Sequence, residues 1–464
     1  MTPSNKMVNR LVQKIGQQAQ ETAEMLSFKQ CRNIALTGIA GGGKTVFLTS
    51  ILSHLAEFGQ GAFHLGKGIE ITDYRAVSSR RKWPQEFRYD DYREDLARGC
   101  WPEKTTDCSS FVCEFKRSDR RLRTQKLSFF DFPGERVADA AIAAFADYTG
   151  WSDHMLNHFS RHHGYREAAG PYLKYMDENI LSEQVVLGEY CLTLARLILD
   201  YKPLISPSTF LLDSAGQPAS FGTAAEISAR RAAGIDFSRQ FAPLSRKARA
   251  DNPELARKMS RIYREYRKNI VLPVFENISR ADTMVILVDI PSLLAGGVGR
   301  YNDNRRILLD LCQGLRSGSF IGSLLGRYLG FWGKSLKRVA LVAAKADLVH
   351  PMDIDNQRMF NLLQMMTDRV GRMLPRVSIK RFVCSACHST YALKNQHRLR
   401  GKLAYENPGR EFREYAVSEL PEVWPDKWVP GEFSFYRVYP DAPQNFLIPP
   451  RHRGLDQVFE FIAG

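Results

Sequence analysis

The sequence lacks any long hydrophobic run. No stretch reaches the roughly 18 apolar residues that would indicate a membrane-spanning helix. The nearest, residues 315–333, is interrupted by Arg316 and Arg327. Residues 1–30 also lack the continuous apolar segment of a signal peptide. These absences predict a cytoplasmic protein, and they leave open a peripheral contact with the inner membrane.

Cysteine is sparse, with eight residues scattered along 464 and no disulfide-rich spacing. That usage is typical of a reducing compartment. The one C-x-x-C pair, Cys384 and Cys387, is followed by His388, which is the pattern of c-type haem attachment. Haem attachment needs an exported chain, and a zinc site would need two more ligands. Both interpretations are therefore disfavoured, and the chain has no internal repeat or low-complexity segment either.

What the sequence does have is a large excess of positive charge. Lys and Arg number 65 against 50 Asp and Glu, a formal charge of +15. Such an excess indicates acidic partners, namely nucleotide phosphates, nucleic acid or an anionic membrane, or simply a surface that keeps the protein soluble. Residues 226–268 hold 12 basic and 5 acidic residues. A solvated helix face is the simplest interpretation of that segment, an anionic membrane is the alternative, and nucleic acid is the least favoured partner.

The chain is too long for one ordinary core, and its 44% apolar content allows a large one. Continuous apolar runs predict strands that are buried on both faces. We therefore expect an α/β fold with a mostly parallel six-stranded sheet, one antiparallel hairpin strand and a large helical insertion. The expected strands are Asn33–Thr37, Ser110–Lys116, Lys126–Asp131, Thr283–Asp289, Arg338–Ala344 and Arg381–Cys384.

The expected domain organisation follows from these strands and the helical patterns between them. Residues 59–105 are predicted to be irregular, and Glu432–Tyr439 is predicted to be a strand. The expected parts are an amphipathic N-terminal helix (1–30), a discontinuous α/β domain (31–136 and 275–400), a helical insertion (137–274) and a C-terminal extension packed on the α/β domain (401–464).

The strongest motif is GIAGGGKT, Gly38–Thr45, a complete G-x-x-x-x-G-K-[ST] pattern between a strand and a helix. Glycines let backbone N–H groups curl around phosphates, and the helix N-terminus favours negative charge. The lysine would contact the β- and γ-phosphates, and the threonine hydroxyl would bind Mg²⁺. The predicted nucleotide contacts here are Gly38, Ala40, Gly41, Gly42, Gly43, Lys44, Thr45 and Val46.

A D-x-x-G motif, Asp131–Gly134, follows the second strand of the expected hairpin. A carboxylate at a strand end can hold Mg²⁺ through water, and a glycine lets its N–H approach the γ-phosphate. We therefore predict Asp131 as a metal residue and Gly134 as a nucleotide contact. A hairpin between the P-loop and the D-x-x-G motif is the Ras-like arrangement. The discontinuous α/β domain is therefore predicted to be a Ras-like P-loop NTPase domain, and it resembles those of translation-factor-like GTPases.

A K-x-D motif, Lys345–Asp347, follows the apolar run at 338–344. A carboxylate can accept both N1–H and the exocyclic amine of guanine, a donor pair that adenine lacks. Asp347 would read the base and Lys345 would lie along it. Ala344 stands where such motifs carry Asn or Thr, which would weaken the link to the P-loop. Ser385 and Ala386 match the short loop whose backbone contacts the guanine carbonyl.

Together these motifs resemble the YcjX-like family, DUF463, through GIAGGGKTVFLTSIL, DFPGERVAD and AAKADLVHP. The resemblance covers the whole chain. It implies binding of GTP and GDP, a Ras-like domain with a helical insertion, and a bacterial cytoplasmic protein of the stress response. It also implies an unidentified protein effector or membrane-linked partner.

Hydrolysis needs a residue that orients water and a threonine that closes over Mg²⁺. Thr105 is favoured over Thr106 for the threonine. Glu135 takes the position where Ras has Gln, and its charge would repel the γ-phosphate. We therefore predict a slow GTPase with Glu135, Lys44 and Thr105 as catalytic residues, and changes of conformation near 99–107 and 131–145. The alternatives are a nucleotide-holding scaffold with negligible turnover and an ATPase. The sequence leaves the oligomeric state open.

Overall fold

The computed structural model describes most of the chain outside the N-terminus and two internal segments. The residues described are 29–38, 42–60, 63, 65–66, 68–78, 84–103, 108–120, 123–132, 134–161, 163–178, 180–201, 240–317, 336–393, 397–404, 411–441, 443 and 447–464. Nearly all of the expected N-terminal helix therefore lies outside the described residues. So do Ala40, Gly41, Thr105, Thr106 and the side chain of Glu135.

The central sheet confirms the α/β, Ras-like fold class. Its strands run in the order β2-β4-β5-β1-β6-β7-β8, with β3 paired to β4. Strands β5, β1, β6, β7 and β8 are parallel, whereas β4 is antiparallel to β5. The strands are β1 (Lys29–Gly38), β2 (Ile71–Val77), β3 (Gln85–Glu86), β4 (Ser109–Arg117), β5 (Thr124–Asp131), β6 (Thr283–Val288), β7 (Arg338–Ala343) and β8 (Ser378–Val383).

The prediction of six strands was wrong, because the residues that the structure describes already place eight strands in this sheet. The additional β2 and β3 arise from the segment expected to be irregular, which also contains helix α3 (Tyr89–Ala97). Strand β2 (ITDYRAV) is mostly exposed, and its apolar residues do not alternate with polar ones, so its sequence lacks the period of a strand. It forms because its backbone pairs with the outer edge of β4, a contact between segments distant in sequence.

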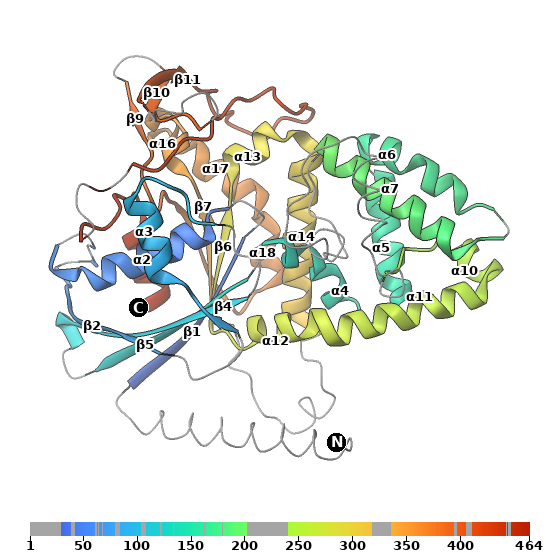
Figure 1. Ribbon diagram of the computed structural model, residues 1–464, viewed down its shortest axis with the longest axis horizontal. Helices are drawn as coiled ribbons and strands as arrows, with labels where there is room; N and C mark the ends of the chain where they lie inside the picture. The colour runs from blue at the N-terminus through green and yellow to red at the C-terminus, as the bar shows by residue number, and fades with distance from the viewer. Residues whose placement is uncertain are drawn as a thin grey trace.

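The strands alternate their side chains between two cores, as the period of two in a strand requires. In β6, Met284 and Ile286 lie in one core, and Val285 and Leu287 lie in the other. The second core is completed by α2 (Lys44–Ala56) and α19 (Leu455–Ala463), near the marked C-terminus in Figure 1. The opposite face is covered by α14 (Gly297–Ser317), α17 (Arg358–Met366) and α18 (Asp368–Met373).

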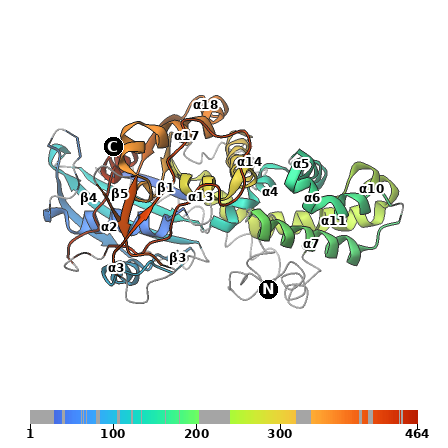
Figure 2. The ribbon, with the colours of Figure 1, turned by 90° about the horizontal axis from the view of Figure 1, so that it is seen from above.

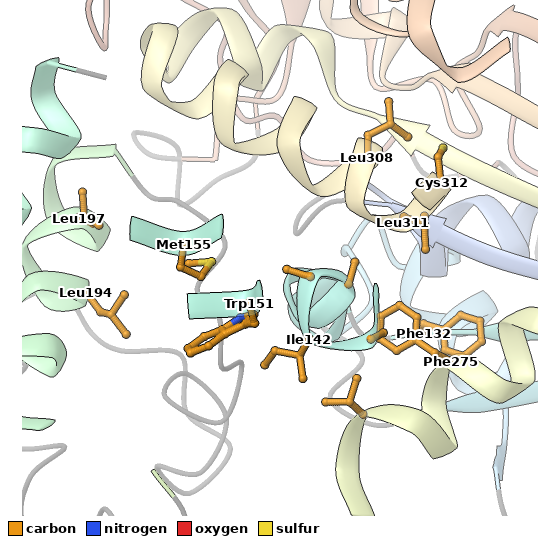
Figure 3. Packing of buried hydrophobic residues seen from close by; sticks show 14 of the residues in the cluster. Phe132, Ile142, Trp151, Met155, Leu194, Leu197, Phe275, Leu308, Leu311 and Cys312 are labelled. Atoms are coloured by element: carbon orange, nitrogen blue, oxygen red, sulfur yellow. The ribbon is translucent and has the colours of Figure 1, made fainter. Parts of the chain in front are cut away.

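A group of helices extends to one side of the sheet (Figures 1 and 2). Its core is aromatic: the ring centroid of Trp151 lies 5.0 Å from that of Phe241 and 5.5 Å from that of Tyr263. In Figure 3, Ile142 lies between Trp151 and Phe132, which follows strand β5. The core of these helices is therefore continuous with the core at the sheet. The helices are α4 (Ala140–Ala144), α5 (Tyr148–Arg161), α6 (His163–Tyr175), α7 (Glu183–Tyr201), α10 (Arg246–Asp251), α11 (Pro253–Tyr266) and α12 (Leu272–Ser279).

The C-terminal part adds a small antiparallel sheet beside the main one (Figure 1). Its strands are β9 (Thr390–Ala392), β10 (Arg398–Gly401) and β11 (Arg413–Ala416). The strand expected at Glu432–Tyr439 was wrong: this segment forms a single bridge, Leu403 with Val438. Its aromatic residues instead pack on other segments: Phe433 and Phe435 lie against the core that α14 and α17 cover, and Tyr436 contacts Tyr415 of β11. Within the described residues, no helix has the length and apolar character needed to cross a membrane.

Candidate nucleotide-binding site

The phosphate loop ends in a backbone conformation that only glycine adopts easily. Gly43 has φ of +79° and is the N-cap of α2, which begins at Lys44. The Lys44 side chain is 9% exposed, and Thr45 is half-buried. The loop therefore delivers the lysine to the N-terminus of a helix, where the dipole favours an anion. Gly38, Gly42 and Val46 are described on either side of it.

Asp131 is brought to the same edge of the sheet by pairing between parallel strands. It is the last residue of β5, lies opposite Leu36 of β1, and is fully buried. Gly134 follows at the start of a short 3-10 turn (Gly134–Asp139) and is also buried. A carboxylate and the Thr45 hydroxyl are hard oxygen donors of the kind that Mg²⁺ prefers. Asp131 and Thr45 therefore fit Mg²⁺, an ion that binds through few protein ligands. Within the described residues, no cluster of three His, Cys, Asp or Glu offers another metal site.

The carboxylate predicted to read the base lies on a second loop at the same edge. Asp347 follows β7, and its Oδ1 is 3.0 Å from the hydroxyl of Ser385, while its Oδ2 accepts a hydrogen bond from Ser389. Burial raises the pKa of Asp347, and the two serine hydroxyls oppose that shift. Both hydroxyls orient the carboxylate. The loop that contains Ser385 and Ala386 is therefore attached directly to the residue that was predicted to select the base.

Lys345 has an unusual backbone conformation and an unexpected partner. Its φ is +60°, in the left-handed region that non-glycine residues rarely adopt. Its Nζ lies 2.6 Å from Oδ2 of Asp289, at the end of β6. Burial disfavours the charged form of Asp289, but the ammonium of Lys345 and the hydrogen bonds from Lys345 and Ser292 together outweigh it and lower the pKa of Asp289. This ion pair holds the lysine stem beside the predicted base position.

Several site residues were missed by the sequence analysis. Asp289 had a usable signal, since it is a carboxylate at the end of a fully buried strand. Ser389 and Thr390, which bonds the carbonyl of Asp347, had none. Cys384 and Cys387 are buried, and burial raises the pKa of both thiols, so neither is a ready thiolate ligand for metal or haem.

Comparison with known proteins identifies the family of the chain. The sequence matches the YcjX-like family, DUF463, over residues 33–201 and 238–464. The chain belongs to the YcjX-like family. It is also similar to the Ras-like GTPase YcjX of Escherichia coli (strain K12), with 26% identity over 366 residues, 71% of this chain and 72% of the relative.

In this YcjX-like protein, the segment after D-x-x-G is bonded to the lateral helices. The hydroxyl of Tyr266, at the end of α11, donates to Asp139 Oδ2 at 2.9 Å. The hydroxyl of Tyr263 lies 2.8 Å from the carbonyl of Phe145. Arg267 donates to the carbonyls of Ile142 and Ala143 at 3.1 Å each. A movement of residues 134–145 would therefore displace α11.

Arg267 lies in the basic segment 226–268, for which a solvated helix face was predicted. Its hydrogen bonds to residues 142 and 143 show that it does not belong to such a face. The basic residues of α11 itself do form an exposed face. An open groove of about 720 Å³ lies between α5, α10 and α11, and Glu254 is the one acidic residue among those that line it. Its basic lining residues are Arg249, Arg257, Lys258, Arg261 and Arg264.

Proposed function

We propose that this chain binds GTP and GDP with Mg²⁺, hydrolyses GTP slowly, and acts as a conformational switch in a bacterial stress response. The observation that carries the proposal is the position of Asp347, held by Ser385 and Ser389 at the sheet edge where the phosphate loop also ends. In open parallel sheets, ligands bind at the carboxyl ends of the strands. The family match and the GTPase named among the similar proteins agree with this assignment.

The chemistry divides among the residues described above. Lys44 would neutralise phosphate charge, and the N-terminus of α2 would hold the β-phosphate. Thr45, Asp131 and Thr105 would hold Mg²⁺, which lowers the charge that develops on the phosphate oxygens. Gly134 would bring a backbone N–H to the γ-phosphate. Asp347 would accept two hydrogen bonds from guanine, while Ser385 and Ala386 contact its carbonyl.

The switch would use the bonds between the D-x-x-G segment and α11. Release of γ-phosphate loosens such segments in GTPases generally. Here the hydroxyl of Tyr266 and the guanidinium of Arg267 would transmit that change to the insertion. We propose the insertion, residues 137–274, as the part that meets the protein effector. All eight cysteines are free thiols, which supports a cytoplasmic location.

Two measurements test the enzymatic part. Calorimetric titration should give tighter binding for GDP than for ADP, and phosphate release in Mg²⁺ should be slow but measurable. A Glu135→Ala variant should release phosphate about tenfold more slowly, because a group that orients water or accepts its proton is removed. An unchanged rate would exclude Glu135 from the mechanism. Negligible release by the wild type would favour the scaffold interpretation, and a preference for ADP would favour an ATPase.

We further propose that the basic groove on α11 contacts an anionic membrane. Arg249 and Lys258 pair with Asp153 and Glu183. Arg257 and Arg264 bond only carbonyls among the contacts described, at 3.3 Å each, so their charge is not neutralised there. Basic residues near an anionic surface contribute about 1 kcal/mol each. The helices that line the groove, α5, α10 and α11, lie away from α2, which begins at the phosphate loop (Figure 1).

Reversal of three charges tests the membrane contact. An Arg257→Glu/Arg261→Glu/Arg264→Glu variant should bind vesicles containing phosphatidylglycerol about 100-fold less well than wild type in flotation assays. A matched control reverses three exposed arginines on the small sheet: Arg398→Glu/Arg400→Glu/Arg413→Glu. Equal losses in both variants would mean a non-specific charge effect. Binding of RNA in place of vesicles would reject the membrane proposal.

A further inference from the structure

The loop predicted to contact the base, residues 384–388, has a partner from the far end of the chain. We name this partner, residues 449–454, the C-terminal strap. The amide of Ser385 donates to the carbonyl of Arg453 at 3.0 Å, and the amide of Arg453 donates back at 2.9 Å. The amide of His388 donates to the carbonyl of Arg451 at 2.8 Å. The strap thus pairs with the loop as an antiparallel partner.

The strap also contacts the helix that begins at the phosphate loop. Nε2 of His54, on α2, lies 3.0 Å from the carbonyl of Pro450. The His54 ring centroid is 4.6 Å from that of His452, which is in turn 5.5 Å from that of Phe63. Burial lowers the pKa of His54 to about 3, so its imidazole is neutral and donates to the carbonyl. The strap therefore contacts both α2, which begins at the phosphate loop, and the loop that is predicted to contact the base.

Gly454, where the strap meets α19, has no room for a side chain. Its φ is +70°, and a Cβ there would lie 2.5 Å from the carbonyl oxygen of Val383, directly before the base loop. Helix α19 cannot easily move away, because Phe459 and Ile462 are fully buried in the core under the sheet. A side chain at 454 would therefore displace the loop rather than the helix.

We infer that the strap sets the position of the base-contacting loop, and that Gly454 and His452 are positioning residues for guanine selectivity. The inference rests on the proposed function. The mechanism runs through Ser385, whose amide bonds the strap and whose hydroxyl orients Asp347. Displacement of the loop turns the carboxylate away from the geometry that accepts two hydrogen bonds from guanine.

The test compares GDP with inosine diphosphate, which lacks the exocyclic amine. The dissociation constant of inosine diphosphate divided by that of GDP reports the second bond to Asp347, and this ratio is unaffected by a fraction of unfolded protein. Calorimetry should show this ratio falling about tenfold in Gly454→Ala, the size of one charged hydrogen bond. His452→Ala should lower it in the same direction by less, because the strap loses a ring contact but keeps its backbone bonds.

Gly431→Ala is the matched control. Gly431 has φ of +87°, so alanine there carries the same backbone strain, yet its Cβ would meet nothing within 4 Å. For this variant, the dissociation constant of inosine diphosphate divided by that of GDP should equal the wild-type value. A wild-type ratio in Gly454→Ala, or an equal fall in Gly431→Ala, would overturn the strap inference alone. Failure of the wild type to prefer GDP over inosine diphosphate would overturn the proposed function as well.

Discussion

Asp347→Asn should bind GDP about 100-fold more weakly than wild type and should gain affinity for xanthosine diphosphate. The carboxylate accepts from N1–H and the exocyclic amine of guanine, so the amide loses one bond and faces an unpaired donor. Xanthine carries a carbonyl in place of the amine, and the asparagine N–H₂ can donate to it. Asparagine keeps an oxygen toward Ser385, whose hydroxyl lies 3.0 Å from Asp347 Oδ1, so the loop should stay in place.

Competition of xanthosine and guanosine diphosphates for the two proteins measures this change. Asp73→Asn is the control, because this carboxylate is 56% exposed and pairs with Lys116 on the outer strands of the sheet. Its nucleotide preference should match that of the wild type. An Asp347→Asn variant that still prefers GDP would show that another group reads the base.

Lys44→Ala should lose roughly 100- to 1000-fold in affinity for both GTP and GDP. The lysine is 9% exposed, and at such a site an ammonium group interacts with phosphate far more strongly than it would in water. The loss should be the same for guanine and inosine nucleotides, because the lysine touches no base. This distinguishes it from the Asp347 variant, in which the loss depends on the base.

A thermal unfolding series measures the Lys44 effect without a label. Ligand at about 100 times its dissociation constant stabilises a protein by roughly 2.7 kcal/mol, so saturating GDP should raise the wild-type melting temperature by several degrees. The same GDP concentration should leave the Lys44→Ala melting temperature nearly unchanged. Lys116→Ala, at an exposed ion pair with Asp73, should respond as the wild type does. A full shift in Lys44→Ala would remove the lysine from the site.

The interior strands could be predicted because their own residues carry the signal. The run TMVILV is buried along its whole length in β6, and the phosphate motif is complete within eight residues. Strand β2 could not be predicted, because its apolar residues do not alternate with polar ones and its register is set by pairing with the edge of β4. The wrong prediction of a strand at Glu432–Tyr439 has the opposite cause. Alternating aromatic residues suggested a strand, but these side chains pack on other parts of the chain without pairing along a neighbouring strand.

The sequence alone determined the phosphate loop, the D-x-x-G turn and the K-x-D motif, because each depends on residue types at fixed local spacing. Only the tertiary structure decided what surrounds them. Asp289 pairs with Lys345 across adjacent strands, and Tyr266 reaches Asp139 from another helix. The C-terminal strap joins the base loop from more than sixty residues away. Contacts between distant segments depend on how the chain packs, and no local pattern specifies them.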